Sequence, residues 1–184
     1  FSADGTHVLD ITQNGELVVL ELARKTAVTI KPPAFSSQVL RDDGRWLVTF
    51  GERVPMQIWD THTGKATATL ETGIAAVAFL GDGKHVVTVA KAKKDVTAKI
   101  RSLSGKSREE IALVGWLVGV DVSPDGRELM LLSNRGRIWG AGGFWRVDAR
   151  PGGRAREIHY EETTWKARPD WSRDGRRVAY SSYP

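Results

Sequence analysis

The chain has 184 residues, 41% of them hydrophobic and 27% charged, which is typical of a globular protein with a substantial core. It has no cysteine, which excludes disulfides and thiolate metal sites. No apolar run could cross a bilayer and no signal peptide is visible in this segment, so the compartment stays open between cytoplasm and periplasm or the extracellular space. The net charge of +5 is spread through predicted turns. We therefore expect a solvated basic surface, with no membrane partner and no nucleic acid.

An Asp-Gly dipeptide recurs at spacings of 39, 39, 43 and 49 residues. The five copies are Asp4-Gly5, Asp43-Gly44, Asp82-Gly83, Asp125-Gly126 and Asp174-Gly175. Glycine tolerates a positive φ and aspartate can hydrogen-bond its own backbone, so each pair is predicted to be a structural turn between two strands. A period near forty residues with strand-like sequence throughout is typical of the four-stranded blades of a β-propeller.

The residues between these turns predict a meander of short strands. In chain order the predicted strands are Thr6–Ile11, Glu16–Leu22, Ala27–Ile30, Ser37–Leu40, Trp46–Phe50, Met56–Asp60, Ala66–Leu70, Ala75–Leu80, His85–Ala90, Thr97–Ser102, Glu109–Leu113, Leu117–Ser123, Glu128–Ser133, Phe144–Asp148, Ala155–Tyr160, Arg168–Ser172 and Arg177–Ser181. Within Leu117–Ser123 valines alternate with small or polar residues, which is the period of a strand. No window of helical length has a convincing helical period.

These strands predict an all-β fold, a segment of a β-propeller built of four-stranded antiparallel blades. We predict one such segment over residues 1–184, with blades at about 1–31, 32–72, 73–114 and 115–164 and a half blade at 165–184. The first unit has almost no inner strand, and the fifth has only its inner two. A propeller closes by joining its first and last blades. We therefore expect about four and a half blades of a larger ring of six to eight.

Two stretches resemble known propeller repeats. Met56–Lys65, which contains Ile58-Trp59-Asp60, is similar to the end of a WD40 repeat, and Val120–Gly126 and Pro169–Ser182 resemble the WD40-like (PD40) repeat of TolB-type propellers. More narrowly, Ser133–Pro184 is similar to the TolB-like propellers of bacterial proteins in which an amidohydrolase or PHP-type domain follows. That resemblance implies metal ligands in the hydrolase domain and none here.

Two glycine-containing motifs are poor candidates for phosphate binding. Gly105-Lys106-Ser107 resembles the end of a P-loop, but Ile100 stands where that motif needs a glycine. The glycine-rich stretch 140–143 lies between Trp139 and Trp145, and a strand rather than a helix follows it. We interpret that stretch as a loop carrying bulky aromatic side chains, which could contact a ligand.

The candidate binding residues gather near the end of the fourth unit. An imidazole and carboxylates could bind a cation or perform acid–base chemistry, although the same connection reads equally as a capped, solvated loop. The candidate binding-face residues are His159, Glu161, Glu162, Trp165, Trp139 and Trp145. No two histidines have the spacing of a zinc pair, and the recurring aspartates favour turn hydrogen bonds over calcium sites. We expect no cofactor, no metal and no catalytic residues.

Two functions remain open from the sequence. The first is a non-catalytic propeller scaffold that binds protein or peptide, or the remaining blades of its own parent chain. The second, implied by the narrower resemblance, is the accessory propeller of a larger secreted or periplasmic metal-dependent amidohydrolase, where it would shape substrate access. An enzyme contained in these residues is not expected, because they include no nucleophile elbow and no metal-binding motif.

Overall fold

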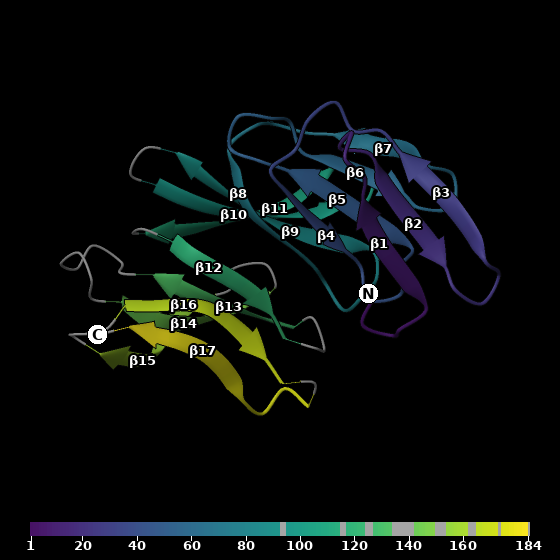
Figure 1. The fold of residues 1–184 in the computed structure, drawn as a ribbon. Coiled ribbons are helices and arrows are strands. Elements are labelled where there is room, and N and C mark those ends of the chain that lie inside the picture. Colours follow the sequence, from purple (N-terminus) through teal and green to yellow (C-terminus); the bar gives the residue numbers. More distant parts are fainter. Residues whose placement is uncertain are drawn as a thin grey trace. The chain divides into compact units, whose positions relative to one another are not determined.

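The structure is a computed structural model that describes residues 1–92, 95–114, 117–123, 127–133, 142–149, 154–161, 165–172 and 174–183. These residues form strands and turns, and the part of the chain so described contains no helix (Figure 1). The protein is therefore all-β, as the strand-period pattern predicted.

The strands follow one another at short intervals along the whole chain. They are β1 His7–Ile11, β2 Leu17–Glu21, β3 Thr26–Ile30, β4 Ser37–Leu40, β5 Trp46–Phe50, β6 Gln57–Asp60, β7 Lys65–Thr69, β8 Ile74–Phe79, β9 His85–Ala92, β10 Asp95–Ser102, β11 Ser107–Val114, β12 Leu117–Val122, β13 Glu128–Ser133, β14 Gly142–Asp148, β15 Ala155–Glu161, β16 Trp165–Trp171 and β17 Val178–Tyr183. The predicted strands are confirmed, and β4, β5 and β13 have the predicted bounds.

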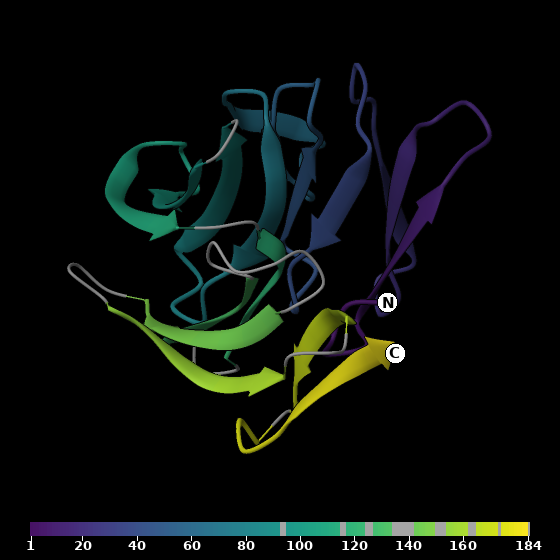
Figure 2. The same cartoon turned by 90° about the vertical axis from the view of Figure 1, so that its left-hand side faces the viewer.

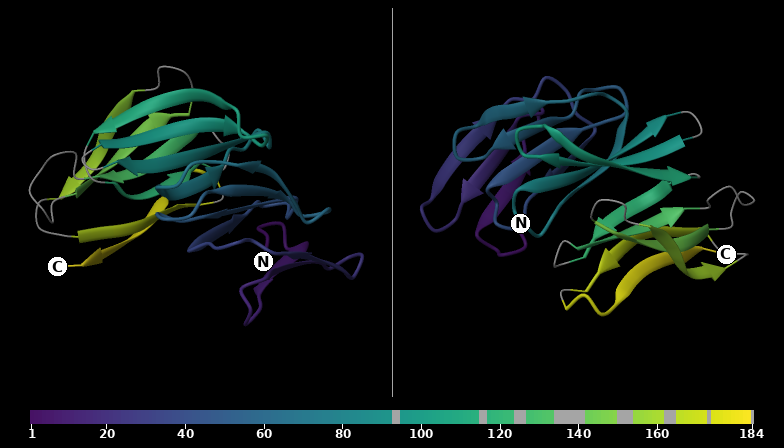
Figure 3. Two further views of the ribbon diagram at one scale, coloured as in Figure 1. Left: turned by 90° about the horizontal axis from the view of Figure 1, so that it is seen from above. Right: turned by 180° about the vertical axis from the view of Figure 1, so that it is seen from behind.

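The chain divides into two compact units, which are described separately. Unit 1 comprises residues 1–75 and 103–106, and unit 2 comprises residues 76–102 and 107–184. Unit 1 holds the sheets β1-β2-β3 and β4-β5-β6-β7. Unit 2 holds the sheets β8-β9-β10-β11, β12-β13-β14-β15 and β16-β17. In every sheet, consecutive strands pair antiparallel, so each is a simple meander (Figure 3).

The Asp-Gly turns share one hydrogen-bond pattern. The residue two before the aspartate donates its N–H to the carbonyl five residues further on, at 2.8–2.9 Å. These donor and acceptor pairs are Ser2 and His7, Arg41 and Trp46, Leu80 and His85, Ser123 and Glu128, and Ser172 and Arg177. The described turn glycines have φ between 66° and 72°, a region in which a side chain is strained. The turn is therefore fixed by backbone bonds and by glycine.

Each unit has its own apolar core between neighbouring sheets. In unit 1, Leu17 and Ile30 of the first sheet pack with Leu47 and Trp59 of the second. In unit 2, one cluster joins the sheets β8–β11 and β12–β15, with members Leu80, Val87, Val89, Ala98, Ile100, Leu129, Leu131 and Val147. Since alternate side chains of a strand point to opposite faces, the two-residue pattern of the strands places these residues together.

Equivalent positions in successive sheets carry different chemistry. In the second sheet the indole Nε1 of Trp59 donates to Thr49 Oγ1 at 3.0 Å. In the third sheet Arg101 takes the place of the tryptophan, and its Nε donates to Thr88 Oγ1 at 3.1 Å. Both hydroxyls are buried, so each bond satisfies a donor that would otherwise cost free energy. The repeats therefore share geometry more than they share residues.

One turn glycine lies directly against a neighbouring sheet. A Cβ added to Gly44 would overlap the imidazole of His7, which is buried at 8% exposure. A Cβ added to Gly5, at the equivalent place in the first turn, would meet nothing within 4 Å. The two glycines have nearly equal φ, 69° and 72°. They therefore separate the backbone requirement for glycine from the packing requirement.

We predict that Gly44→Ala destabilises the protein more than Gly5→Ala does. Both changes force alanine into a left-handed conformation, at about 1–2 kcal/mol. Only Gly44→Ala also overpacks the site against His7, for about 1–3 kcal/mol more. Urea denaturation of both variants measures the difference in free energy of unfolding. Equal losses would mean that the turn at Gly44 is not packed against β1.

Candidate functional site

The structure describes part of the predicted binding group. Side chains are described for His159 in β15 and for Trp145 in β14, whereas only the backbone is described for Glu161 and Trp165, in β15 and β16. Glu162 and Trp139 lie outside the described residues, as do the turn residues Asp125 and Gly126. The chemistry of the site is therefore argued below from His159, Trp145 and their described neighbours.

A bulge places His159 and Trp145 on opposite faces of their sheet. His159 pairs with Phe144, and the register then shifts so that Glu157 pairs with Trp145. Because neighbouring residues of a strand point to opposite faces, Trp145 faces away from Phe144 and His159. Trp145 is half-buried and packs on the core formed with sheet β8–β11. It supports the sheet from the other side, while His159 is exposed.

His159 belongs to a group of three rings that the sequence did not bring together. Tyr180 of β17 lies against Phe144 with ring centroids 4.7 Å apart and tilted by 56°. The His159 ring lies 6.2 Å from Tyr180 and 6.3 Å from Phe144. Tyr180 remains 39% exposed. We call these three residues the aromatic surface. The available signal for Tyr180 was its two-residue spacing from the apolar Val178, which puts both on one face.

The hairpin β16–β17 holds Tyr180 in this position. Its residues Trp171 and Val178 pack on Met130, Leu132 and Phe144 of the sheet β12–β15, beside which the hairpin lies in Figure 2. A hydrogen bond of 2.9 Å fixes the same contact. It runs from the Trp171 N–H to the Asp121 carboxylate. The aromatic surface thus stands on packed strands, which hold side chains in a defined geometry better than loops do.

Arginines adjoin the aromatic surface on the same face. Arg146 pairs in register with Arg156, two positions along from the pair of Phe144 and His159. The guanidinium of Arg146 forms an ion pair with Glu128. Its Nε is nevertheless buried without a hydrogen-bond partner, and so is the indole Nε1 of Trp171. Buried donors without acceptors are rare and costly, so these two N–H groups mark a place for an acceptor.

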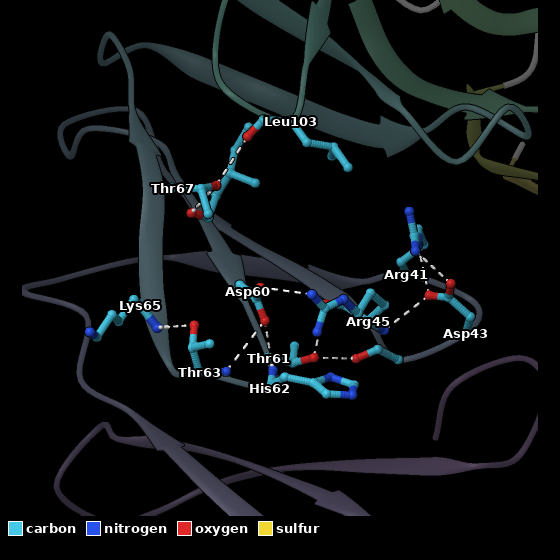
Figure 4. A network of polar contacts seen from close by, with 12 residues as sticks. Arg41, Asp43, Arg45, Asp60, Thr61, His62, Thr63, Lys65, Thr67 and Leu103 are labelled. Atoms are coloured by element: carbon cyan, nitrogen blue, oxygen red, sulfur yellow. Dashed lines mark hydrogen bonds and ion pairs between the residues drawn. The ribbon is translucent and has the colours of Figure 1, made fainter.

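A second polar network surrounds the turn end of the sheet β4–β7 (Figure 4). Asp60 accepts hydrogen bonds from the N–H groups of His62 and Thr63 and an ion pair of 2.9 Å from Arg45. Thr61 Oγ1 donates to the Gly44 carbonyl at 2.7 Å. Backbone groups and a neighbouring arginine therefore use the carboxylate oxygens of Asp60. The network joins two turns of one sheet, and we interpret it as structural.

The described residues show neither a metal-binding cluster nor a membrane helix. Within the described ranges, no three side chains of His, Cys, Asp or Glu gather in a way that could hold a metal ion. The same ranges contain no helix long and apolar enough to span a membrane.

The comparisons with known proteins give a fold and no family. No protein-family model matches the chain, and no curated protein matches it. Among solved structures, 684 chains match, and one of them is TolB from Acinetobacter baumannii. The similarity to TolB has a TM-score of 0.65 at 19% sequence identity and covers 95% of this chain. It spans 45% of the TolB chain, so the present chain matches less than half of that protein. The chain therefore has a fold similar to the TolB β-propeller.

The turn carboxylates are acidic because the turn itself hydrogen-bonds them. The Ser2 hydroxyl, at 2.6 Å, and then the N–H and hydroxyl of Thr6 lower the pKa of Asp4 from 3.8 to about 2. In the same way the Ser172 hydroxyl, followed by the Arg176 N–H, lowers the pKa of Asp174. A carboxylate held by donors in the folded state favours folding while it is ionised.

We predict that Ser172→Ala raises the pKa of Asp174 toward its ordinary value of 3.8. The lowered pKa means that the ionised carboxylate stabilises the fold above pH 3.8 and that this contribution is lost as pH falls through the folded-state pKa. Titration of the aspartate carboxyl carbons by NMR measures the change. Ser172→Thr keeps the hydroxyl donor and serves as control. An unchanged pKa in Ser172→Ala would show that the hydroxyl does not hold the carboxylate.

Proposed function

We propose that this chain is a segment of a β-propeller, about four and a half blades of a larger ring, and that it is a non-catalytic scaffold for protein or peptide. The similarity to the TolB propeller over 95% of the chain supports the blade interpretation of the sheets. Propellers are rigid frames that present surfaces on strands and loops, and they host many unrelated functions. The argument for binding therefore rests on the surface of this chain.

The observation that carries the proposal is the exposed aromatic surface. Tyr180 keeps 39% of its area exposed although it sits on Phe144, and the His159 beside it is exposed. Tyrosine and histidine combine an apolar ring with polar atoms, and such rings are enriched where proteins bind partners. The rings are held by packed strands, so little conformational entropy is lost on binding.

The proposal that the chain is not itself an enzyme rests on how its acids are used. Asp4 and Asp174 accept hydrogen bonds within their turns, and Asp60 accepts them from His62 and Thr63. A general acid or base needs a proton that it can exchange with substrate. The accessory role beside an amidohydrolase remains a second hypothesis that rests on the resemblance of residues 133–184. A purified chain that hydrolyses esters, amides or phosphates above buffer would contradict the first part of the proposal.

We predict that peptides selected from a random display library bind the purified chain, and that Tyr180→Ala weakens the binding of those that use the aromatic surface. Loss of a central aromatic anchor costs about tenfold or more in Kd. Fluorescence polarisation measures the affinity. Ile158→Ala is the matched control, because Ile158 is 49% exposed on the same strand as His159 and lies outside the three rings. Failure to select any peptide that binds in the micromolar range would overturn the scaffold proposal.

A further inference from the structure

The aromatic surface continues into a larger uncovered area of the sheet β12–β15. On its two outer strands, Phe144 and Arg146 of β14 share one face with His159 and Arg156 of β15. The strand β17 lies against Phe144, and among the described residues its other edge pairs with no strand. His159 and Arg156 are exposed beyond that edge. We call this part of β14 and β15, together with the adjoining Arg154, the open face.

The open face has an aromatic layer and a cationic layer. The pair of Phe144 and His159, with Tyr180 above it, forms the aromatic layer. The pair of Arg146 and Arg156 forms the cationic layer two positions along both strands. Residues two apart on a strand are separated by about 6.6 Å and point to the same side. An extended segment beside β17 therefore meets the two layers with alternate side chains.

Positive charge at this end of the sheets is uncompensated. Arg154 and Arg156 are exposed, and in the part of the chain that the structure describes neither guanidinium forms an ion pair. Arg176 and Arg177 are exposed at the start of β17. They lie at the same end, because the bond from Trp171 to Asp121 brings together the ends of the strands that precede the two turns. Four exposed arginines face solvent where Glu128 is already paired with Arg146.

The buried donors add a second indication of an anionic ligand. Arg146 belongs to the cationic layer, and Trp171 packs on the cluster that contains Phe144. The Nε of Arg146 and the Nε1 of Trp171 both lack acceptors. Carboxylate oxygens accept strong hydrogen bonds from guanidinium and indole N–H groups, so a ligand carrying carboxylates would satisfy what the protein leaves open.

We propose that the open face binds an acidic segment of a partner protein in extended conformation. The segment runs antiparallel to β17 along its free edge, as in strand addition to a sheet. It places one apolar side chain on the aromatic layer and carboxylates at the second and fourth positions after it, toward Arg146, Arg156 and Arg154. The inference deepens the scaffold function proposed above and rests on it. Complementary charge gives such a complex its specificity and its dependence on salt.

The test uses a short labelled peptide with the pattern Leu-x-Glu-x-Glu and a counterpart with lysine in place of both glutamates. We expect the glutamate peptide to bind and the lysine peptide not to bind. In the double variant Arg154→Gln and Arg156→Gln, the Kd should rise by about tenfold or more and depend less on salt. Arg24→Gln is the charge-matched control in unit 1, where the Arg24 side chain is 67% exposed beside Glu21. Its Kd should stay within about twofold of that of the unaltered chain.

A second measurement reads the buried donor directly. The indole N–H resonance of Trp171, identified by its loss in Trp171→Phe, should shift when the glutamate peptide binds. This readout does not depend on the stability of the arginine variants, because it is made on the unaltered chain. Inorganic phosphate that produces the same shift at a similar concentration would reduce the site to a simple anion subsite and overturn the peptide proposal.

Other outcomes identify a different occupant. Equal affinity for the lysine peptide, or unchanged affinity in the double arginine variant, would overturn the proposal. So would tighter binding of a single-stranded oligonucleotide with the same dependence on both arginines. If a longer natural protein that contains this chain does not bind the peptide, its own strands cover the open face. If library-selected peptides bind but ignore these arginines, the scaffold function stands and the acidic-segment inference fails.

Discussion

The backbone bond that closes each Asp-Gly turn determines most of this structure. The N–H of the residue two before the aspartate bonds to the carbonyl five residues later, as from Ser2 to His7 and from Ser172 to Arg177. This bond fixes the register of the hairpin, and register decides which side chains face the core. A turn slipped by one residue would turn Leu47 or Val87 away from its cluster. Local turn chemistry therefore controls packing between sheets.

The strands were predictable because their causes are local, whereas the aromatic surface was not. Two-residue periodicity and Asp-Gly pairs are visible in any short window, and β4, β5 and β13 were located by them. Tyr180 and Phe144 meet only because two sheets pack together. No short window contains that contact. Trp145 shows the same limit, since its neighbours in the core come from strands β9 and β10 as well as its own sheet.

The sheets show how little identity the fold requires at equivalent positions. A tryptophan and an arginine occupy one position in successive sheets, and each donates to a threonine hydroxyl. In the next sheet Val147 and Leu131 occupy the two positions, and the contact is purely apolar. What each version shares is a filled space and no unsatisfied donor. A TM-score of 0.65 at 19% identity to TolB is consistent with such exchange.

The bulge in β15 has a consequence for the sign of the surface charge. One extra residue, Ile158, separates His159, which opposes Phe144, from Glu157, which opposes Trp145. Counting simply by twos from His159 would put Glu157 on the open face and turn Arg156 toward the core. Deletion of that single residue would therefore exchange an arginine for a glutamate at the surface and bury a guanidinium. The electrostatic character of this face is encoded by the length of the strand as much as by its composition.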